Sequence, residues 1–294
     1  MKNILFIAFL LSNLNILFAQ NTQTDTNLYL FKKNDGTEYI GKLLSDDGRE
    51  ILILTEKLGK IFIPKSEINS IVVIKDKNSI VRGEFHSEGP FTTRHSFTTN
   101  ALPIKKGENY AMVNLYGPEV HFAVTDHLNI GIMSTWIASP VAIAVKYTFP
   151  SNNPKVNFSI GTLMGTSGYL DNFSSLGGLH FGNLTYGDRK NNITFSAGYG
   201  YLLNAWDDPY EGPIISIAGI AKVGAKASFI FDSMFGSFKY GTDYTTNALV
   251  IMPGMRFQTK ENRALQVSLA GVASFEMGYI SSFPLPMVSW FYKF

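Results

Sequence analysis

The chain has 294 residues, of which 45% are hydrophobic and 16% are charged, and its formal net charge is +2. Ordinary globular domains carry roughly 25% charged residues, so this chain is poor in charge for a soluble protein. The nearly balanced charge does not favour nucleic-acid binding, and we expect no nucleic-acid partner. The absence of cysteine excludes a disulfide framework and a lipid attached to cysteine.

The first residues have the pattern of a secretory signal peptide. Lys2 supplies a positive charge, an interrupted apolar stretch covers Ile4–Leu17, and the small residue Ala19 marks a cleavage site. We therefore expect residues 1–19 to be a signal peptide and residues 20–26 to be a polar leader. No stretch of the sequence approaches the apolar run of about 20 residues that a membrane-spanning helix requires.

Residues 27–75 are expected to form a small β-domain. The turn residues Asp35-Gly36 and Asp47-Gly48 separate short apolar runs, which is a strong hairpin signal. Asp35–Lys42 resembles the opening hairpin of SH3-like or Sm-like domains, and Ile63–Ile68 resembles their late turn. The resemblance implies a binding module, so we expect a periplasmic partner for this domain.

Residues 76–107 are expected to connect this domain to a second one, because glycine and proline recur there without a sustained period. From residue 108 to residue 294 the sequence repeats alternating segments separated by turn signals. These segments start near residues 108, 119, 128, 140, 154, 175, 192, 213, 225, 247, 263 and 286.

The alternation has a clear physical meaning. Ile193 and Phe195 fall on one face of a segment and Thr194 falls on the other. Apolar residues opposite small polar ones at period two indicate lipid on one side and a lumen on the other. We therefore predict an all-β protein, a transmembrane antiparallel β-barrel of about 12 strands preceded by the small β-domain.

The last strand supports an outer-membrane location. Val288, Trp290, Tyr292 and Phe294 share one face, as expected for a terminal strand that carries aromatic residues at the membrane interface and directs insertion. If this strand ends at the periplasm, the short connections lie there and the long ones lie outside. An even strand number then also places the small β-domain in the periplasm.

Three stretches resemble outer-membrane barrel proteins of Bacteroidetes-type bacteria. They are Arg94–Leu102, Lys105–Tyr110 and Val124–Gly131, which combine an apolar-proline-basic-glycine entry with a Thr-Asp hairpin. The resemblance implies the outer membrane of a Gram-negative cell. The partners that we expect there are membrane lipid, lipopolysaccharide and the barrel assembly machinery.

A set of basic residues is the main candidate for a function. By alternation its members point into the lumen: Lys146, Lys222, Lys226, Arg256 and Lys293. Rings of charge set the selectivity of pores, so these residues favour a channel. The alternative is that they reach interfacial water from strand ends. We predict a non-enzymatic, porin-like narrow channel or a structural or interaction protein of the envelope.

The expected outer loop of residues 205–212 is aromatic and acidic. Its ligand candidates are Trp206, Asp207, Asp208, Tyr210 and Glu211. Carboxylates suit calcium, but the spacing differs from that of a calcium loop. Solvent or lipopolysaccharide contact is therefore the alternative interpretation of this loop.

Catalysis is the competing class of function. His86, His95 and His127 are expected to be exposed, and His121 and His180 are expected to face the lumen. Neither lumen histidine has a serine two positions away, and no Gly-x-Ser-x-Gly motif occurs. We therefore expect no enzyme, no metal and no cofactor. A lipid-active barrel enzyme similar to an outer-membrane phospholipase and a soluble secreted β-protein are the alternatives.

Overall fold

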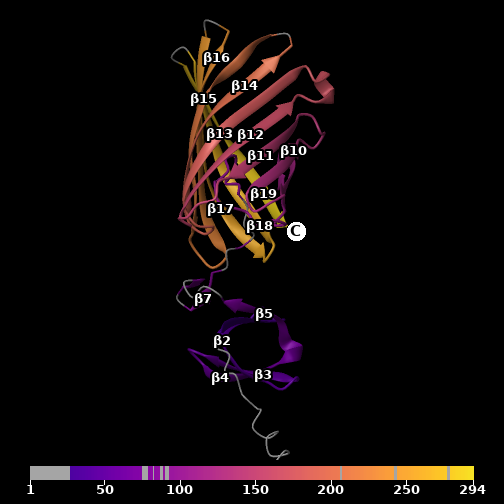
Figure 1. Ribbon diagram of the computed structural model, residues 1–294, viewed down its shortest axis with the longest axis vertical. Coiled ribbons are helices and arrows are strands. Elements are labelled where there is room, and N and C mark those ends of the chain that lie inside the picture. Colours follow the sequence, from indigo (N-terminus) through magenta and orange to yellow (C-terminus); the bar gives the residue numbers. More distant parts are fainter. Residues whose placement is uncertain are drawn as a thin grey trace, which may run out of the picture. The chain divides into compact units, whose positions relative to one another are not determined.

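The structure is a computed structural model of the chain. It describes residues 27–74, 79–81, 83–86, 89, 93–205, 207–241, 244–276 and 279–294. The expected signal peptide and polar leader lie outside the described residues. The chain divides into two compact units, residues 1–86 and residues 87–294, and each is described by itself (Figure 1).

The first unit contains a five-stranded antiparallel sheet in the order β4-β3-β2-β1-β5. Its elements are β1 (Leu28–Lys33), β2 (Glu38–Asp46), β3 (Glu50–Thr55), β4 (Gly59–Pro64), the 3-10 helix η2 (Lys65–Glu67) and β5 (Ile68–Ile74), and a two-stranded piece follows with β6 (Ile80–Val81) and β7 (Glu84–Phe85). Gly36 and Gly48 turn the first two hairpins with φ of 87° and 92°, which favours glycine. The likeness of this sheet to SH3-like or Sm-like domains stays a prediction.

The second unit is a closed antiparallel barrel of 12 strands, which confirms the predicted fold class. Neighbours in sequence pair around the wall, and β19 pairs with β8 to close it. The strands are β8 (Tyr110–Asn114), β9 (Gly117–Ala123), β10 (Leu128–Ser134), β11 (Val141–Thr148), β12 (Val156–Thr166), β13 (Ser175–Gly187), β14 (Asn192–Asn204), β15 (Asp207–Lys222), β16 (Ala227–Tyr240), β17 (Tyr244–Lys260), β18 (Arg263–Glu276) and β19 (Tyr279–Lys293), with the 3-10 helix η4 (Tyr169–Asp171) between β12 and β13. Among the described residues, no helix is long and apolar enough to cross a membrane.

The two ends of the barrel differ. At one end lie the start of β8, the end of β19 and brief connections such as Asp188–Asn191 and Glu261–Asn262, and we call it the short-turn end. The opposite end, the far end, is uneven because β8 to β11 have 5 to 8 residues and β13 to β19 have 13 to 17. Figure 1 shows the longer strands extending past the shorter ones at the far end.

The longer strands take up residues that the sequence analysis assigned to an outer loop. β15 begins at Asp207 and β16 ends at Tyr240, and Glu211 pairs with Lys239 between them. Main-chain hydrogen bonds of a hairpin do not require apolar alternation, so the ladder continues beyond the alternating part of the sequence. The expected loop of residues 205–212 is therefore mostly strand.

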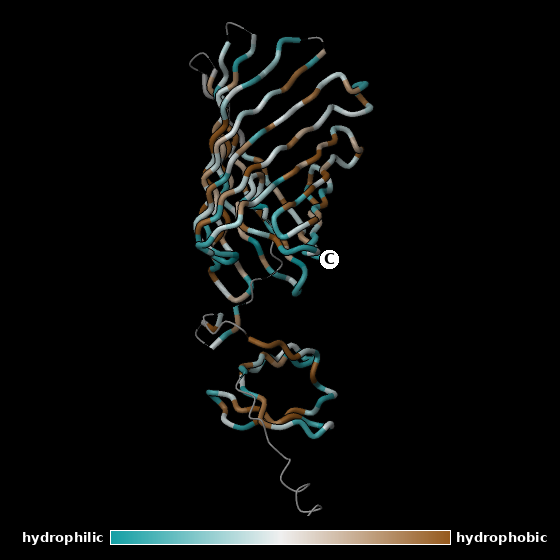
Figure 2. Tube along the Cα trace, viewed as in Figure 1, coloured by the Kyte–Doolittle hydropathy of each residue, from teal (hydrophilic) through white to brown (hydrophobic). Residues whose placement is uncertain are grey.

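Side chains alternate between the outer face and the lumen, as the sequence pattern predicted. Phe158 is 47% exposed, whereas its neighbour Asn157 is 4% exposed and faces inward. The terminal-strand candidates follow the same rule, because Val288, Trp290 and Tyr292 lie on the outer face of β19 and Phe294, the residue after it, is also exposed. In Figure 2 the short-turn end is mostly hydrophilic, and apolar residues recur along the strands above it.

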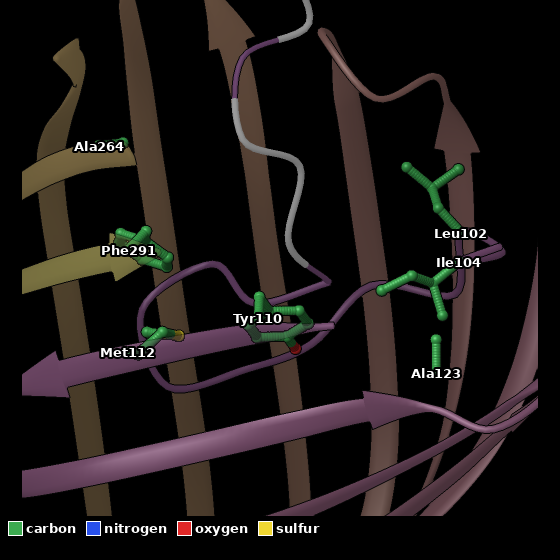
Figure 3. Packing of buried hydrophobic residues seen from close by; sticks show 7 residues of the cluster. All are labelled: Leu102, Ile104, Tyr110, Met112, Ala123, Ala264 and Phe291. Atoms are coloured by element: carbon green, nitrogen blue, oxygen red, sulfur yellow. The ribbon is translucent and has the colours of Figure 1, made fainter. Parts of the chain in front are cut away.

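A cluster of buried apolar side chains closes the seam of the barrel. It consists of Leu102, Ile104, Tyr110, Met112, Ala123, Ala264 and Phe291. Figure 3 shows Tyr110 and Met112 on β8, Phe291 on β19, and Leu102 and Ile104 on the segment that precedes β8. The cluster therefore includes residues of this segment and of the first and last barrel strands.

Candidate functional site: a segment bound inside the barrel

Residues 93–102 lie inside the barrel, and we call them the lumen segment. Thr93, His95 and Asn100 are at most 2% exposed. The segment folds back on itself, because Asn100 N–H donates to the Thr93 carbonyl at 2.8 Å and His95 N–H donates to the Thr98 carbonyl at 3.0 Å. The sequence analysis assigned these residues to a connector and found that Arg94–Leu102 resembles outer-membrane barrel proteins, and the structure places them in the lumen.

Asp232 of β16 binds the tip of the lumen segment. Its Oδ2 accepts the backbone N–H groups of Ser96, Phe97 and Thr98 at 3.0, 2.8 and 2.9 Å, and its Oδ1 accepts the Thr98 hydroxyl at 2.9 Å. Successive N–H groups directed at one carboxylate form an anion-binding nest. Asp232 is only 2% exposed, so these charge-assisted bonds are shielded from water.

Arg256 of β17 binds the segment just before its tip. Its Nη2 donates to the carbonyls of Arg94 and His95 at 2.9 and 3.0 Å. Gln266 of β18 accepts from Arg256 at 2.8 Å and donates to Ser96 Oγ at 2.8 Å. One guanidinium therefore connects two barrel strands to the backbone of the lumen segment.

Two further strands hold the part of the segment that follows the tip. Lys146 Nζ of β11 donates to the Asn100 carbonyl at 2.7 Å. Thr185 Oγ1 of β13 accepts the Ala101 N–H at 2.7 Å. Together with the contacts from β16, β17 and β18, these bonds hold the segment from five strands of the wall.

A buried ion pair adds a further link between segment and wall. Arg94 Nε lies 3.2 Å from Glu119 Oε1 of β9, and the two side chains are 13% and 0% exposed. His121 Nε2 lies 3.4 Å from the same oxygen, and its ring stacks on Tyr110 at 4.6 Å. A buried carboxylate requires a nearby cation, so Arg94 ties the segment to the barrel by charge.

The lumen segment separates two spaces. On the far-end side lies a cavity of about 100 Å³, whose lining includes Phe97 and Thr98 of the segment. On the short-turn side lies a space of about 30 Å³, which we call the basic vestibule. Its charged lining residues are all basic among the described residues: Arg94, Arg189, Lys190, Lys222, Lys226 and Arg256.

The basic residues predicted to form one ring have three different environments. Lys146 and Arg256 bind the lumen segment. Lys222 and Lys226 line the basic vestibule. Lys293 Nζ lies 2.8 Å from Glu108 Oε1, outside both groups. Alternation placed these side chains on the lumen face but did not reveal the segment that divides them.

Glu108, just before β8, is the centre of a charged cluster with a pH-dependent role. Burial by itself would raise its pKa, but hydrogen bonds from Arg189 and Lys293 outweigh burial and lower the pKa to about 2. The stabilisation is therefore present above the ordinary value of 4.5 and is lost as the pH falls toward 2.

We expect the melting temperature of Glu108→Gln to approach that of the wild type as the pH falls to 2. The variant should melt at a lower temperature above pH 4.5, because only the wild type gains the charged form. Circular-dichroism melting in detergent from pH 2 to pH 7 measures this difference, with Glu261→Gln in an exposed turn as the control. A difference in melting temperature between the variant and the wild type that is equal at every pH would contradict this role of Glu108.

Two histidines lie elsewhere than predicted. His95 was expected to be exposed but is 1% exposed, with Nε2 3.2 Å from Asn192 Oδ1. His180 was expected in the lumen but is exposed on the outer face. The reason is that Leu179 and Phe181 take the lumen positions of β13, so apolar residues point inward there. His121 is buried in the lumen, where it was predicted.

The described acidic and aromatic candidates near residue 208 lie at exposed positions. Trp206 lies outside the described residues. Asp207 accepts a hydrogen bond from the Tyr240 hydroxyl. The others are exposed positions of β15: Asp208, Tyr210 and Glu211. In the described part of the chain, no group of three or more His, Cys, Asp or Glu side chains could hold a metal ion.

Comparison with known proteins yields only distant structural neighbours. The sequence matches no protein-family model and none of the curated proteins. Among solved structures, outer-membrane expressed OmpT of Vibrio cholerae has 10% identity and a TM-score of 0.39, with 91% of this chain and 94% of that chain covered. The outer membrane channel DcaP of Acinetobacter baumannii has 10% identity and a TM-score of 0.36, with the same coverage. The closed ladder of strands itself defines the barrel architecture.

Proposed function

We propose that this chain is an integral outer-membrane β-barrel that acts as a narrow, plugged channel. The lumen segment is the plug, and solute passes when the segment leaves its seat. The observation that carries the proposal is the Asp232 carboxylate, which holds three successive backbone N–H groups in the middle of the lumen. Because these bonds are non-covalent, they can hold the lumen segment in the barrel and can also release it.

The envelope location rests on three features. The barrel exposes aromatic and aliphatic side chains on its outer face, including Trp290, Tyr292 and Phe294. The sequence begins with a signal-peptide pattern and resembles outer-membrane barrels of Bacteroidetes-type bacteria. In such an envelope the short-turn end and the small β-domain face the periplasm. The partners are then membrane lipid, lipopolysaccharide, the barrel assembly machinery and a periplasmic ligand of the small β-domain.

A non-enzymatic role fits the way the buried polar groups are used. Arg94 neutralises Glu119 inside the barrel, away from lipid, and His121 lies 3.4 Å from the same carboxylate oxygen. One contact favours the lipid-active alternative, because Thr162 Oγ1 lies 2.9 Å from His180 Nδ1 on the outer face. A hydroxyl beside an imidazole is a nucleophile-base pair, and fatty-acid release from phospholipid by the purified barrel would favour that alternative.

The decisive test is single-channel conductance of the full chain in planar bilayers. We expect the wild type to stay closed and a variant with residues 93–100 replaced by a glycine-serine segment of equal length to conduct steadily. Its current should prefer anions, because the basic vestibule lies on the path, and Lys222→Glu should reduce that preference.

A matched control replaces residues 167–174, the loop at the far end, by glycine and serine. Each variant must first show the heat-modifiable gel migration of a folded barrel. Silence of the plug-replaced variant in its folded form would refute the channel and favour a structural role. Steady conductance of the wild type equal to that of the variant would refute the plug.

A further inference from the structure

Much of the lumen lining on the far-end side of the lumen segment is apolar, which is unusual for a barrel interior. Water-filled barrel lumens are lined by polar residues. Here the cavity on the far-end side of the segment is lined by inward apolar side chains: Met133, Leu163, Leu179, Phe181, Ile214 and Met234. They come from five strands, β10, β12, β13, β15 and β16, so they form an apolar belt around the cavity.

The floor of this cavity contains a buried cation without an anionic partner. Lys146 is 5% exposed, and its Nζ donates to the Asn100 carbonyl at 2.7 Å and approaches Thr99 Oγ1 at 3.4 Å. Both partners are neutral, and no carboxylate forms an ion pair with Lys146 in the part of the chain that the structure describes. A buried ammonium group is costly unless it is paired, so an anion at this floor would stabilise it.

Polar atoms with no protein partner also line the cavity. Asn129 Nδ2, Ser196 Oγ and Ser216 Oγ are buried without a hydrogen-bond partner among the described residues. Asn129 is 4% exposed, and its Oδ1 already contacts His121 Nδ1 at 3.2 Å, which leaves the amide N–H groups as donors. Unsatisfied buried donors of this kind mark a place where a ligand acceptor fits.

The unpaired cation and the unpaired donor lie side by side. Asn129 of β10 is the register partner of Lys146 of β11, and both side chains face the lumen. Side chains directly opposite each other on paired strands are neighbours. Together they present an ammonium group and an amide donor at the base of an apolar belt.

We propose that this cavity binds a single-chain amphiphile with a carboxylate head. The carboxylate contacts Lys146 Nζ and Asn129 Nδ2, and the aliphatic chain lies against the apolar belt and extends toward the far end. The site goes beyond the proposed channel. It requires a seated lumen segment, because Phe97, Thr98 and Thr99 contribute to its lining, but it does not require that the segment ever moves.

The test compares two probes with one chain length and different heads, decanoate and decanol. Isothermal titration calorimetry uses the full chain in lipid nanodiscs, with empty nanodiscs subtracting the partition of the probes into lipid. We expect the wild type to bind decanoate about tenfold more tightly than decanol, because a charge-assisted bond replaces a neutral one. Lys146→Met should abolish this preference, and Asn129→Leu should reduce it.

Leu179→Asn should weaken the binding of both probes equally, because it changes the apolar belt and not the site of the carboxylate head. Lys260→Met, an exposed lysine at the end of β17, is the control for a change of charge. The ratio of the affinity for decanoate to the affinity for decanol distinguishes loss of the carboxylate site from a general disruption of the lumen. A general disruption lowers both affinities and leaves their ratio unchanged. An unchanged ratio in Lys146→Met, or no binding of decanoate to the folded wild type, would overturn the proposal whether or not the barrel conducts.

Discussion

Asp232→Ala is expected to release the lumen segment and expose the Arg94–His95 bond to trypsin. The alanine removes four hydrogen bonds to the segment and leaves the N–H groups of Ser96, Phe97 and Thr98 without an acceptor. Hydrogen bonds to a charged group contribute about 1.5–3 kcal/mol each, so loss of this carboxylate should cost at least about 3 kcal/mol. At 1.4 kcal/mol for each factor of ten, the unseated population should rise on the order of 100-fold or more.

Limited trypsin digestion in detergent, with mass spectrometry of the Arg94–His95 cleavage, measures this release. Cleavage of Asp232→Asn should be intermediate between that of Asp232→Ala and that of the wild type. The amide oxygen still accepts hydrogen bonds, whereas the amide nitrogen faces other donors. Ser233→Ala, the next residue of β16, is the matched control because its hydroxyl bonds the Ile217 carbonyl and not the segment. Equal protection of wild type and Asp232→Ala, with both barrels folded, would show that Asp232 does not seat the segment.

Breaking the buried ion pair between Arg94 and Glu119 should destabilise the barrel strongly when either partner is changed alone. Glu119→Gln leaves a buried guanidinium without its anion, and Arg94→Met leaves a fully buried carboxylate without its cation. Each is expected to lower the free energy of unfolding by about 3–5 kcal/mol. The double variant should lose much less than the sum, because no buried charge of the pair is left uncompensated.

Urea unfolding in detergent, followed by heat-modifiable migration, supplies the four free energies of this double-mutant cycle. Glu38→Gln is the surface control, since it breaks a 3.7 Å contact with Lys32 in the first unit, where an exposed pair contributes about 0–1 kcal/mol. Additive losses in the cycle would mean that Arg94 and Glu119 are not coupled. The contact between Glu119 and His121 remains in Arg94→Met. The free energy that this variant loses on a further Glu119→Gln change therefore also includes the contribution of that contact.

The lumen segment, the basic vestibule and the apolar belt lie at different levels of one lumen. Basic side chains lie at the short-turn end, polar anchors hold the segment in the middle, and apolar residues lie beyond it. A ligand bound to the belt would rest on Phe97 and Thr98, which are also the residues held by Asp232. We therefore expect ligand binding and the seating of the lumen segment to be linked through these shared residues, and each can be measured separately.

The sequence by itself determined the barrel and an approximate number of 12 strands. A barrel wall separates lipid from lumen, so each strand records both environments at period two, as Ile193, Thr194 and Phe195 show. This signal is local and repeats along the chain. The segments predicted to start near residues 128, 175, 192 and 263 therefore coincide with the starts of β10, β13, β14 and β18.

Only the tertiary structure decided what fills the lumen. The bonds that seat the lumen segment join residues far apart in sequence, such as Ser96 and Asp232, and no sequence pattern links the two residues. The same holds for Lys146 and Asn129, whose pairing depends on the register of two strands. The direction of the side chains of β13 was also predicted wrongly, because the apolar residues Leu179 and Phe181 line a cavity and do not face lipid. Alternation reports that a side chain faces inward, but closure of the barrel determines what it meets there.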